Sequence, residues 1–549
     1  MPFLLPPGTP EQRKALGAYY TEARVARALC RWAVRRGGER VLDPAFGGGV
    51  FVRQALLRGA ELGGVSVAGV ELEERAFDAL AAASAGAASS ELIRGSVLNV
   101  RPCALGLFDA VVGNPPFIRF QRLSAQARRE ARDAAADAGV ELSPLAGSWV
   151  AFTVHAGTFL SPGGRLALVV PAEAGHAPSA RPLLRHLREN FAEVTFVTFR
   201  SPLFHSLDQD VLLLLASGKG GGPADFRGLV LSGPEALDAP LPCRGDRQLT
   251  AGALLGGVES LSAQLLSPDA LELYRRLGSA DGVRLGDIAS VESGYVTGAN
   301  AHFHLSPERA DALGLPAASL VPTVFRSRAL SGLLFDEERW RGAAAAGRAG
   351  YLAQVAGFEG EPGVRRFLRE LEEAGVHRRY KARTRSPWYR VARVGSPPLL
   401  LASVGADGLP LAVNRAGASA PNTFHAVTPA TGVDALALAA AWHTSLGALS
   451  LELEGHALGG GLLKLDPGEA LRVLLPEPRP LPEAALQALD AALAAGEPDR
   501  ARSIADELLL LDTGLLTAAE LETVRRATAQ LRELRRPPRK RAARSILSS

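Results

Sequence analysis

Residues 41–49 read Val41-Leu42-Asp43-Pro44-Ala45-Phe46-Gly47-Gly48-Gly49, and this stretch decides how we expect the first part of the chain to fold. A short apolar run ends at the acidic Asp43, and a glycine turn leads into a helical pattern. Glycine lets a ligand approach the backbone closely, and Asp43 offers a partner for a cation. The stretch lacks the GxGxxG fingerprint, and no lysine follows as in a phosphate loop. A ligand with separate ammonium and carboxylate groups fits better, with an unliganded strand–helix turn as the alternative.

Seven apolar runs alternate with helical stretches on either side of this turn. They are Arg40–Asp43, Val65–Glu71, Glu91–Gly95, Leu107–Gly113, Arg165–Pro171, Glu193–Phe199 and Val211–Ala216. Apolar strands separated by helices indicate a mostly parallel sheet that is covered on both faces. We therefore predict an α/β fold with a doubly wound, seven-stranded sheet.

A second acidic residue, Glu71, lies 22 residues beyond Gly49, at the end of the next predicted strand. An acid in this position can accept hydrogen bonds from the two hydroxyls of a ribose. An acid at a strand end is otherwise a solvated cap. The spacing after a glycine turn favours ribose binding.

The most specific motif is Asn114-Pro115-Pro116-Phe117, which follows the apolar run LFDAVVG. Pro115 and Pro116 stiffen the turn by fixing their own φ angles, and neither donates a hydrogen bond. Carbonyl oxygens and the Asn114 side chain remain as acceptors for a planar amino group, and Phe117 can stack on the ring that carries it. This arrangement suits chemistry on an exocyclic amine, with a plain Pro-Pro turn as the alternative.

These motifs together resemble the gamma class of N6-adenine DNA methyltransferases, the type found in restriction–modification and phage-defence systems. GAYYTEARVARAL at residues 17–29 is similar to the amino-terminal motif of this family, DPAFGGG to its cofactor loop, VELE to its ribose-binding segment, and NPPF to its catalytic tetrapeptide. The order, with the amino-terminal motif first and recognition sequences last, is that of the gamma class. The resemblance implies a class I methyltransferase sheet and S-adenosyl-L-methionine as the methyl donor.

The resemblance also implies roles for individual residues. Asn114 and the Pro115 carbonyl would bind the adenine amine, with Phe117 stacked on the flipped base and Pro116 completing the catalytic turn. The cofactor would be held by Tyr20 and Thr21 at its methionine part, by Glu71 at its ribose, and by a cradle of Asp43, Ala45, Gly47 and Gly49.

Two further positions bear on the comparison with the family pattern. Ser96 stands where the family usually has an Asp that binds the adenine amino group of the cofactor, so the resemblance implies weaker cofactor binding. Phe204, in SPLFHSLDQDVLLLL, is similar to a later motif whose ring packs against the target base, although it also suits a core position.

Beyond residue 218 the alternation of strands and helices stops. The glycine run GKGGGP, Gly218–Pro223, indicates a linker, so we predict a methyltransferase domain over residues 1–218. Residues 228–480 read as an irregular α+β domain, and the resemblance makes it a target-recognition domain. VESGYVTGANAHFHL, KARTRSPWYRV and GGGLLKLDP are similar to its family segments. Arg385, Trp388 and Tyr389 are then candidate DNA contacts, with a buried Trp–Tyr pair as the alternative.

Residues 481–549 form the last predicted part, a helical region with a basic tail. From Arg535 to the last residue there are six cations and no acid. Pro537 and Pro538 interrupt any helix there, so we predict a flexible arm that is attracted to phosphates. A solvated end without a partner is the alternative.

Composition limits the remaining possibilities. The three cysteines, Cys30, Cys103 and Cys243, exclude a disulfide scaffold or a CxxC metal motif, and the histidines lack metal-ligand spacing, so we expect no metal. No apolar run reaches the roughly 18 residues of a membrane span, and no signal peptide is evident. We therefore expect a cytoplasmic protein whose partner is double-stranded DNA, with a separately encoded restriction endonuclease or defence protein as a further candidate.

The expected reaction is methyl transfer from S-adenosyl-L-methionine to adenine N6 of a flipped base in a specific DNA site. Two alternatives stay open at the level of sequence. One is methylation of RNA bases or of a protein glutamine amide, because an NPP turn suits any planar amine. The other is a catalytically weak DNA-binding subunit, which the Ser96 substitution mildly favours.

Overall fold

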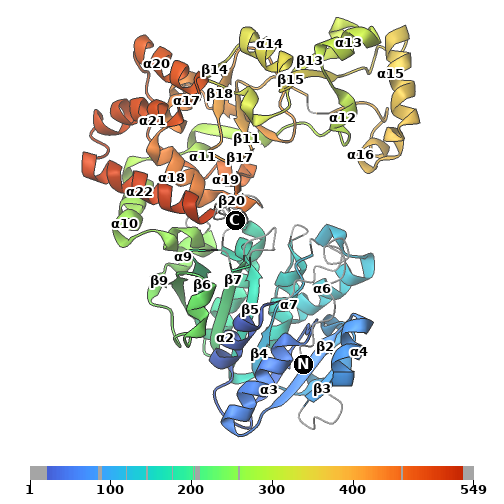
Figure 1. Cartoon of the computed structure of the whole chain (residues 1–549), viewed down its shortest axis with the longest axis vertical. Coiled ribbons are helices and arrows are strands. Elements are labelled where there is room, and N and C mark those ends of the chain that lie inside the picture. Colours follow the sequence, from blue (N-terminus) through green and yellow to red (C-terminus); the bar gives the residue numbers. More distant parts are fainter. Residues whose placement is uncertain are drawn as a thin grey trace, which may run out of the picture. The chain divides into compact units, whose positions relative to one another are not determined.

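The computed structural model describes residues 21–535, except 84–89, 119, 144–145, 176, 202, 205–210, 257–259, 393 and 459–460. The chain divides into two compact units, residues 1–265 and 266–549, which are drawn together in Figure 1. Among the described residues no helix is long and apolar enough to cross a membrane. The three cysteines are free thiols, with Cys30 buried and the other two exposed.

The first unit is built on a nine-stranded sheet in the order β3-β2-β1-β4-β5-β7-β6-β8-β9. The strands are β1 (Arg40–Asp43), β2 (Ser66–Glu71), β3 (Ser90–Arg94), β4 (Phe108–Gly113), β5 (Leu160–Pro171), β6 (Phe191–Phe199), β7 (Val211–Lys219), β8 (Asp225–Leu231) and β9 (Arg247–Leu249). Strands β3, β2, β1, β4 and β5 are parallel, whereas β7 is antiparallel to both of its neighbours. All seven predicted strands are present, but the sheet has two more than predicted.

Helices cover both faces of this sheet, as a doubly wound fold requires. Side chains of α2 (Ala23–Ala33) and α3 (Val50–Leu62) share one apolar core with one face of the strands, and α4 (Glu74–Ala83) packs beside them. Side chains of α6 (Ala125–Asp137), α7 (Ser148–Thr158) and α8 (Arg181–Asn190) form the second core on the other face. Because the strands are buried on both faces, they read as continuous apolar runs rather than as alternating patterns.

The glycine run Gly218–Pro223 is a turn within the sheet and not the predicted linker. Strand β7 ends at Lys219, and β8 begins at Asp225 and pairs in parallel with β6. Gly218 and Gly220 have φ angles of +71° and +88°, which a side chain would disfavour. The glycines therefore serve tight backbone geometry, and the first unit extends well past residue 218.

Among its described residues, the second unit contains four small sheets. The largest has the order β11-β19-β16-β18-β14, made of Ala289–Ser293, Phe424–Pro429, Leu399–Ala402, Leu411–Asn414 and Leu334–Phe335. A three-stranded sheet, β12-β15-β13, joins His304–Leu305, Ala349–Ala353 and Leu320–Val324. Helices α13 (Pro307–Leu313) and α15 (Pro362–Glu373) share a core with this second sheet. The mixture of short strands and helices agrees with the predicted α+β character.

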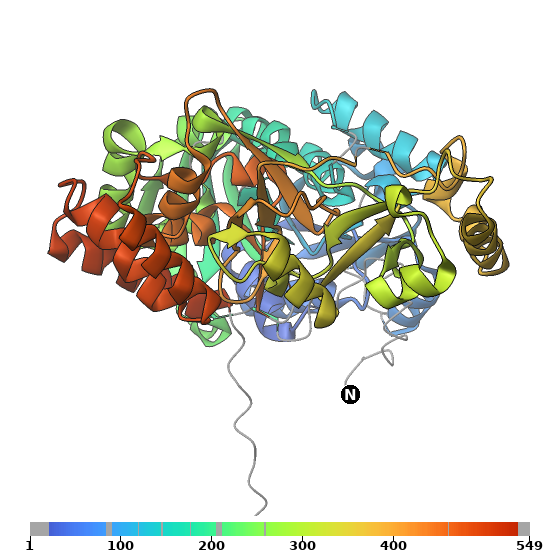
Figure 2. The ribbon, with the colours of Figure 1, turned by 90° about the horizontal axis from the view of Figure 1, so that it is seen from above.

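The carboxyl-terminal helices belong to the second unit rather than to a region of their own. α20 (Glu483–Ala494) and α21 (Pro498–Asp506) contribute Leu489 and Ala501 to the core that also contains the five-stranded sheet. Figure 1 shows α20 beside α21, and α22 (Ala518–Arg535) beside α18 (Ser445–Glu454); Figure 2 shows the red carboxyl-terminal helices from above. The predicted boundary at residue 481 therefore separates no independent core.

Arg535 was predicted as the first cation of a flexible arm, and this prediction is wrong. It is the last residue of α22, its side chain is only 5% exposed, and its Nε lies 3.0 Å from Oε2 of the buried Glu452. Arg532, one turn earlier, contacts the same carboxylate. The rest of the predicted arm, residues 536–549, lies outside the described residues.

Candidate functional site

Four of the predicted site residues lie in a row along one edge of the large sheet. Glu71 and Asp43 are the last residues of β2 and β1, Asn114 directly follows β4, and Ser96 lies two residues after β3. These four strands are adjacent and parallel, in the order β3-β2-β1-β4. Neighbouring strands are about 4.8 Å apart, so the row from Ser96 to Asn114 spans roughly 14 Å. The carboxyl edge of a parallel sheet is where open α/β folds bind ligands.

The Asp43 side chain is suited to bind a cation. It is fully buried, and its Oδ1 accepts a hydrogen bond from the Ala45 N–H at 3.3 Å. Its Oδ2 is buried with no hydrogen-bond donor among the described residues. Burial raises the pKa of Asp43 well above its usual value, and the nearby Glu71 carboxylate adds to the rise. An ammonium group beside Oδ2 would compensate the buried charge, so the site fits the amino-acid end of S-adenosyl-L-methionine.

The glycine turn is tied directly to Glu71. Gly47 has a φ of +51°, and its N–H donates to Glu71 Oε2 at 2.7 Å. Gly49 has a φ of +74°, and a Cβ there would lie 2.7 Å from the Leu80 side chain. The positive φ favours glycine at position 49, and a side chain there would also require the Leu80 side chain to move. Glu71 Oε1 accepts from the Glu73 N–H at 2.7 Å. Each carboxylate oxygen keeps a second lone pair, so Glu71 can still accept hydrogen bonds from ribose hydroxyls.

The turn at Asn114-Pro115-Pro116-Phe117 is held from two sides. The Asn114 Nδ2 donates to Thr21 Oγ1 at 3.1 Å, which orients the amide. The Ser148 hydroxyl donates to the Pro116 carbonyl at 2.5 Å, while the Pro115 carbonyl has no hydrogen-bond donor among the described residues. Of the two proline carbonyls, the one predicted to bind an amine is thus the one that remains available. Tyr20, predicted beside Thr21, lies outside the described residues.

The two predicted aromatic residues share an apolar environment. Phe117 is half-buried and packs against the cores on both faces of the sheet. Phe204 is 8% exposed and belongs to the core that Phe117 contacts on one face. The core interpretation of Phe204, left open by the sequence, therefore fits its burial. Phe117 is the less buried of the two residues and is the better candidate for stacking on a base.

Ser96 begins a short turn that a buried histidine holds in place. The turn continues as the 3-10 helix Val97–Asn99. The His155 Nε2 lies 3.0 Å from the Val97 carbonyl and 2.9 Å from the Val100 carbonyl, and the side chain is 1% exposed. Burial lowers the pKa of His155, so the ring is neutral at pH 7 and Nε2–H donates to both carbonyls.

Ser148 and His155 are positioning residues that the sequence analysis missed. Both lie on α7, seven residues apart, and this spacing places them on one face of the helix. No motif marks them, because a serine or histidine in an apolar helix resembles an ordinary core residue. Their partners, the Pro116 carbonyl and the carbonyls of Val97 and Val100, become visible only when the chain is folded.

The predicted DNA contacts at Arg385, Trp388 and Tyr389 are engaged within the second unit. Arg385 Nη1 donates to the Thr297 carbonyl at 3.0 Å, and Nη2 donates to the Val296 carbonyl. Trp388 and Tyr389 pack edge to face, 5.4 Å apart, against an apolar core. The Tyr389 hydroxyl donates to Glu359 at 2.8 Å. The Glu359 carboxylate opposes the binding of a phosphate at Tyr389. Packing of Trp388 and Tyr389 against each other therefore fits these two rings better than a contact with the DNA backbone.

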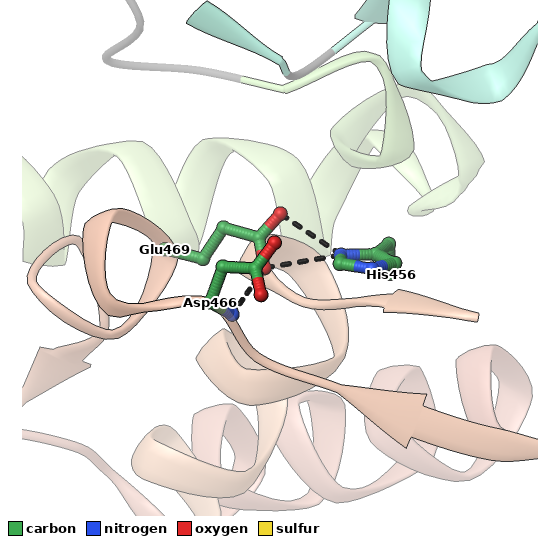
Figure 3. Close-up of side chains that lie close together, drawn as sticks. All are labelled: His456, Asp466 and Glu469. Carbon is green, nitrogen blue, oxygen red and sulfur yellow. Dashed lines mark hydrogen bonds and ion pairs between the residues drawn. The ribbon is translucent and has the colours of Figure 1, made fainter. Parts of the chain in front are cut away.

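One cluster in the second unit has the residue types of a metal site (Figure 3). Ligand atoms of His456, Asp466 and Glu469 all lie within 4.8 Å of one another. The His456 Nδ1 lies 3.0 and 3.1 Å from the two Glu469 oxygens, and Glu469 accepts from the Asp466 N–H. Asp466 and Glu469 form the capping box of α19 (Pro467–Ala470), and Lys464 pairs with Asp466 at 2.8 Å. Helix capping and a lysine cation thus account for the cluster.

Comparisons with known proteins match both units. A model of the N-6 DNA Methylase family matches residues 3–181, and a model of the C-terminal domain of Type II methyltransferase M.Eco57I matches residues 259–510. Type II methyltransferase M.XamI of Xanthomonas campestris pv. amaranthicola is 24% identical over 84% of this chain and 85% of its own length. For M.PaeR7I of Pseudomonas aeruginosa the identity is 25%, over 81% and 82%. The crystal structure of the type IIG restriction endonuclease BpuSI matches 96% of this chain and 67% of that chain, with 13% identity and a TM-score of 0.42.

Proposed function

We propose that the chain is an N6-adenine DNA methyltransferase of a restriction–modification system and that it methylates adenine N6 within one specific DNA sequence, which its similarity to the N-6 DNA Methylase family and to Type II methyltransferases supports. The methyl donor is S-adenosyl-L-methionine. The observation that carries this proposal is the row of strand ends, in which Asp43 lies between Glu71 and the Asn114 turn. The similarity to the N-6 DNA Methylase family and to Type II methyltransferases favours DNA as the substrate over RNA or a protein amide.

The order of side chains along the sheet edge supports the assignment of cofactor contacts. Ser96, Glu71 and Asp43 follow one another in the order expected for the adenine, the ribose and the methionine part of the cofactor. Bound there, S-adenosyl-L-methionine supplies a sulfonium methyl group that a nitrogen lone pair can attack. Asp43 balances the ammonium charge, and the glycine turn leaves room for the ligand beside the backbone.

The Asn114 turn lies at the end of this row and supplies the acceptors for the target amine. Asn114 Oδ1 and the Pro115 carbonyl each accept one N–H of the amine, which directs its lone pair toward the methionine end of the site. Phe117 stacks on the base once it has left the duplex, which offsets unstacking by roughly 1–3 kcal/mol. Holding the amine in line with the methyl group can remove roughly 7–11 kcal/mol of the barrier.

The decisive experiment is to express the chain in a host without adenine methylation and to sequence the host DNA by a method that detects modified bases. We expect N6-methyladenine at one sequence motif. Asn114→Ala should abolish the signal while cofactor binding, measured by calorimetry, stays largely intact, because Asn114 faces the amine. Methylated cytosine, or near-normal methylation by Asn114→Ala, would contradict the proposal.

The restriction–modification family also makes a separately encoded endonuclease for the same motif the expected partner.

A further inference from the structure

Two acid-free segments of the second unit meet at one surface. Residues 293–307 and 374–406 contain no Asp or Glu. Arg385 joins them by donating to the carbonyls of Val296 and Thr297. Gly298, with a φ of +77°, packs so closely that a Cβ there would lie 2.7 Å from the Lys381 Cβ. The loop and the basic segment therefore form one surface.

The exposed side chains of this surface are mostly cationic. We define the Val296–Tyr380 surface as Val296, Arg379, Tyr380, Lys381 and Arg383, all of which are exposed. Within the described part of the chain, no carboxylate lies within ion-pair distance of its three cations. Of these cations, Arg379 lies beside His302, whose Nε2 is 3.5 Å from Arg379 Nη2. Three cations without counter-charges attract a polyanion.

The same surface carries exposed apolar side chains. Tyr380 is 69% exposed and Val296 is 36% exposed, and they are the large hydrophobic residues left exposed among the described residues of the second unit. Tyr380 begins the short helix α16 (Tyr380–Arg383), with the Lys381 ammonium 5.9 Å from its ring centroid. An exposed aromatic ring within a row of cations matches a duplex, which offers phosphates along its strands and apolar base edges in its grooves.

We propose that the Val296–Tyr380 surface contacts duplex DNA and contributes to reading the recognition sequence. Arg379, Lys381 and Arg383 bind phosphates and set the register of the duplex. Tyr380 and Val296 make apolar contacts with base edges, such as the methyl group of thymine. Arg385 is a positioning residue, because its donors hold the Val296 loop against the basic segment. This inference rests on the proposed function, since a site-specific DNA methyltransferase needs such a surface.

The phosphate contacts are tested by removing one cation at a time. Affinity for duplex DNA is measured at several salt concentrations for the full-length chain, for Lys381→Ala and for Arg383→Ala. Arg500→Ala is the matched control, because Arg500 is an exposed arginine on α21, 70% exposed and paired with Glu497. Each surface variant should weaken binding to all duplexes alike and flatten the slope of log affinity against log salt by about 0.9. Slopes equal to that of Arg500→Ala would overturn the phosphate contacts.

The base contacts are tested with Tyr380→Ala and Tyr380→Phe. The motif found by sequencing host DNA supplies the target duplex, and a scrambled duplex of equal length supplies the comparison. Tyr380→Ala should lose about tenfold of the preference for the target with little change on the scrambled duplex, whereas Tyr380→Phe keeps the preference. Leu57→Ala, at an exposed leucine on α3, controls for loss of an apolar side chain. An unchanged preference in Tyr380→Ala would overturn the reading role.

Failure of this inference and failure of the proposed function give different results. If the wild-type chain leaves host DNA unmethylated, the proposed function fails, and the salt slopes on random duplexes still test the cations. If the wild-type chain methylates one motif while every surface variant binds and methylates as the wild type does, only the Val296–Tyr380 surface is refuted.

Discussion

At the scale of single residues, His155 shows how a buried side chain can shape a binding loop without touching the ligand. Its neutral ring donates to the carbonyls of Val97 and Val100, directly after Ser96. We expect His155→Gln to raise the KM for S-adenosyl-L-methionine several-fold while kcat at saturating cofactor stays close to the wild-type value. The glutamine amide cannot reproduce the position of the imidazole N–H, so the two carbonyls lose a well-placed donor, which should also cost about 1–3 kcal/mol of stability. Steady-state kinetics with thermal unfolding of the same protein measures both effects.

The split between KM and kcat separates positioning from a general loss of folded protein. A variant that is merely less stable would lower the apparent kcat in proportion to the active fraction and leave KM unchanged. Phe204→Leu serves as the comparison, because it removes an aromatic ring from the core on the opposite face of the sheet. An unchanged KM in His155→Gln would show that the turn after Ser96 keeps its shape without the histidine.

The sequence could identify the site residues that belong to a local motif. Asp43, Glu71 and Asn114 each follow an apolar run directly, and parallel strands place such positions on one edge. Arg385, by contrast, stands in a basic segment and suggests a DNA contact, yet its guanidinium is engaged by the Thr297 and Val296 carbonyls. Sequence carries no sign of such a long-range backbone contact. For the same reason it singled out Arg385 and passed over the exposed Tyr380.

At the scale of elements, one carboxylate attaches helix α20 to the five-stranded sheet of the second unit. Asp490 Oδ1 accepts from the N–H groups of Leu333 and Leu334 at 2.8 and 3.1 Å and from Arg339 Nη1 at 2.7 Å. Burial alone would raise the pKa of Asp490, but the hydrogen bonds from Arg339 and the two backbone groups outweigh it and lower the pKa. The ionised form of Asp490 therefore stabilises the folded state relative to the unfolded state.

We expect Asp490→Asn to destabilise the second unit by about 1–3 kcal/mol at pH 7. A group with a depressed pKa stabilises the fold above its unfolded pKa of about 3.9, and this contribution is lost as pH falls through the lower folded pKa. The difference in stability between wild type and variant should therefore be full at pH 6 and shrink below pH 4. Urea unfolding of both proteins at a series of pH values measures it. A constant difference down to pH 3 would mean that the charge of Asp490 contributes nothing.

The sequence predicted the first seven strands of the first unit but not where their sheet ends. Each predicted strand from Arg40–Asp43 to Val211–Ala216 has a counterpart, because strands buried on both faces leave long apolar runs in the sequence. The segments of β8 and β9 were missed, since they follow a glycine run that reads equally well as a linker or as a turn. Pairing of β8 with β6 decides between the two, and pairing is not a local property of the sequence.

Across the whole molecule, some cations pair with buried carboxylates, whereas others belong to segments that can bind DNA. Arg525, Arg532 and Arg535 all lie on α22, yet each contacts a carboxylate with an exposed fraction of 2% or less. These three arginines are thus paired with buried carboxylates within the second unit. Residues 536–549 contribute five further cations and no acid, so the composition of this tail still predicts attraction to DNA.

Two truncations that differ by one residue separate these roles. Deletion of residues 536–549 should leave the unfolding temperature unchanged and flatten the slope of log affinity against log salt by roughly 2, because about half of the five cations engage phosphates at 0.9 each. Deletion of residues 535–549 should give the same slope but a lower unfolding temperature. Loss of Arg535 leaves the buried Glu452 with Arg532 as its remaining arginine partner, at a cost of about 1–3 kcal/mol.

The methylated motif should be the same for the full chain and for both truncated chains, because phosphate contacts carry no base information. Salt titrations of DNA binding, thermal unfolding and sequencing of host DNA together check the three expectations. An unchanged salt slope after removal of residues 536–549 would show that the tail does not contact DNA. A changed motif would show that the tail reads bases, which would assign sequence recognition to a part of the chain other than the Val296–Tyr380 surface.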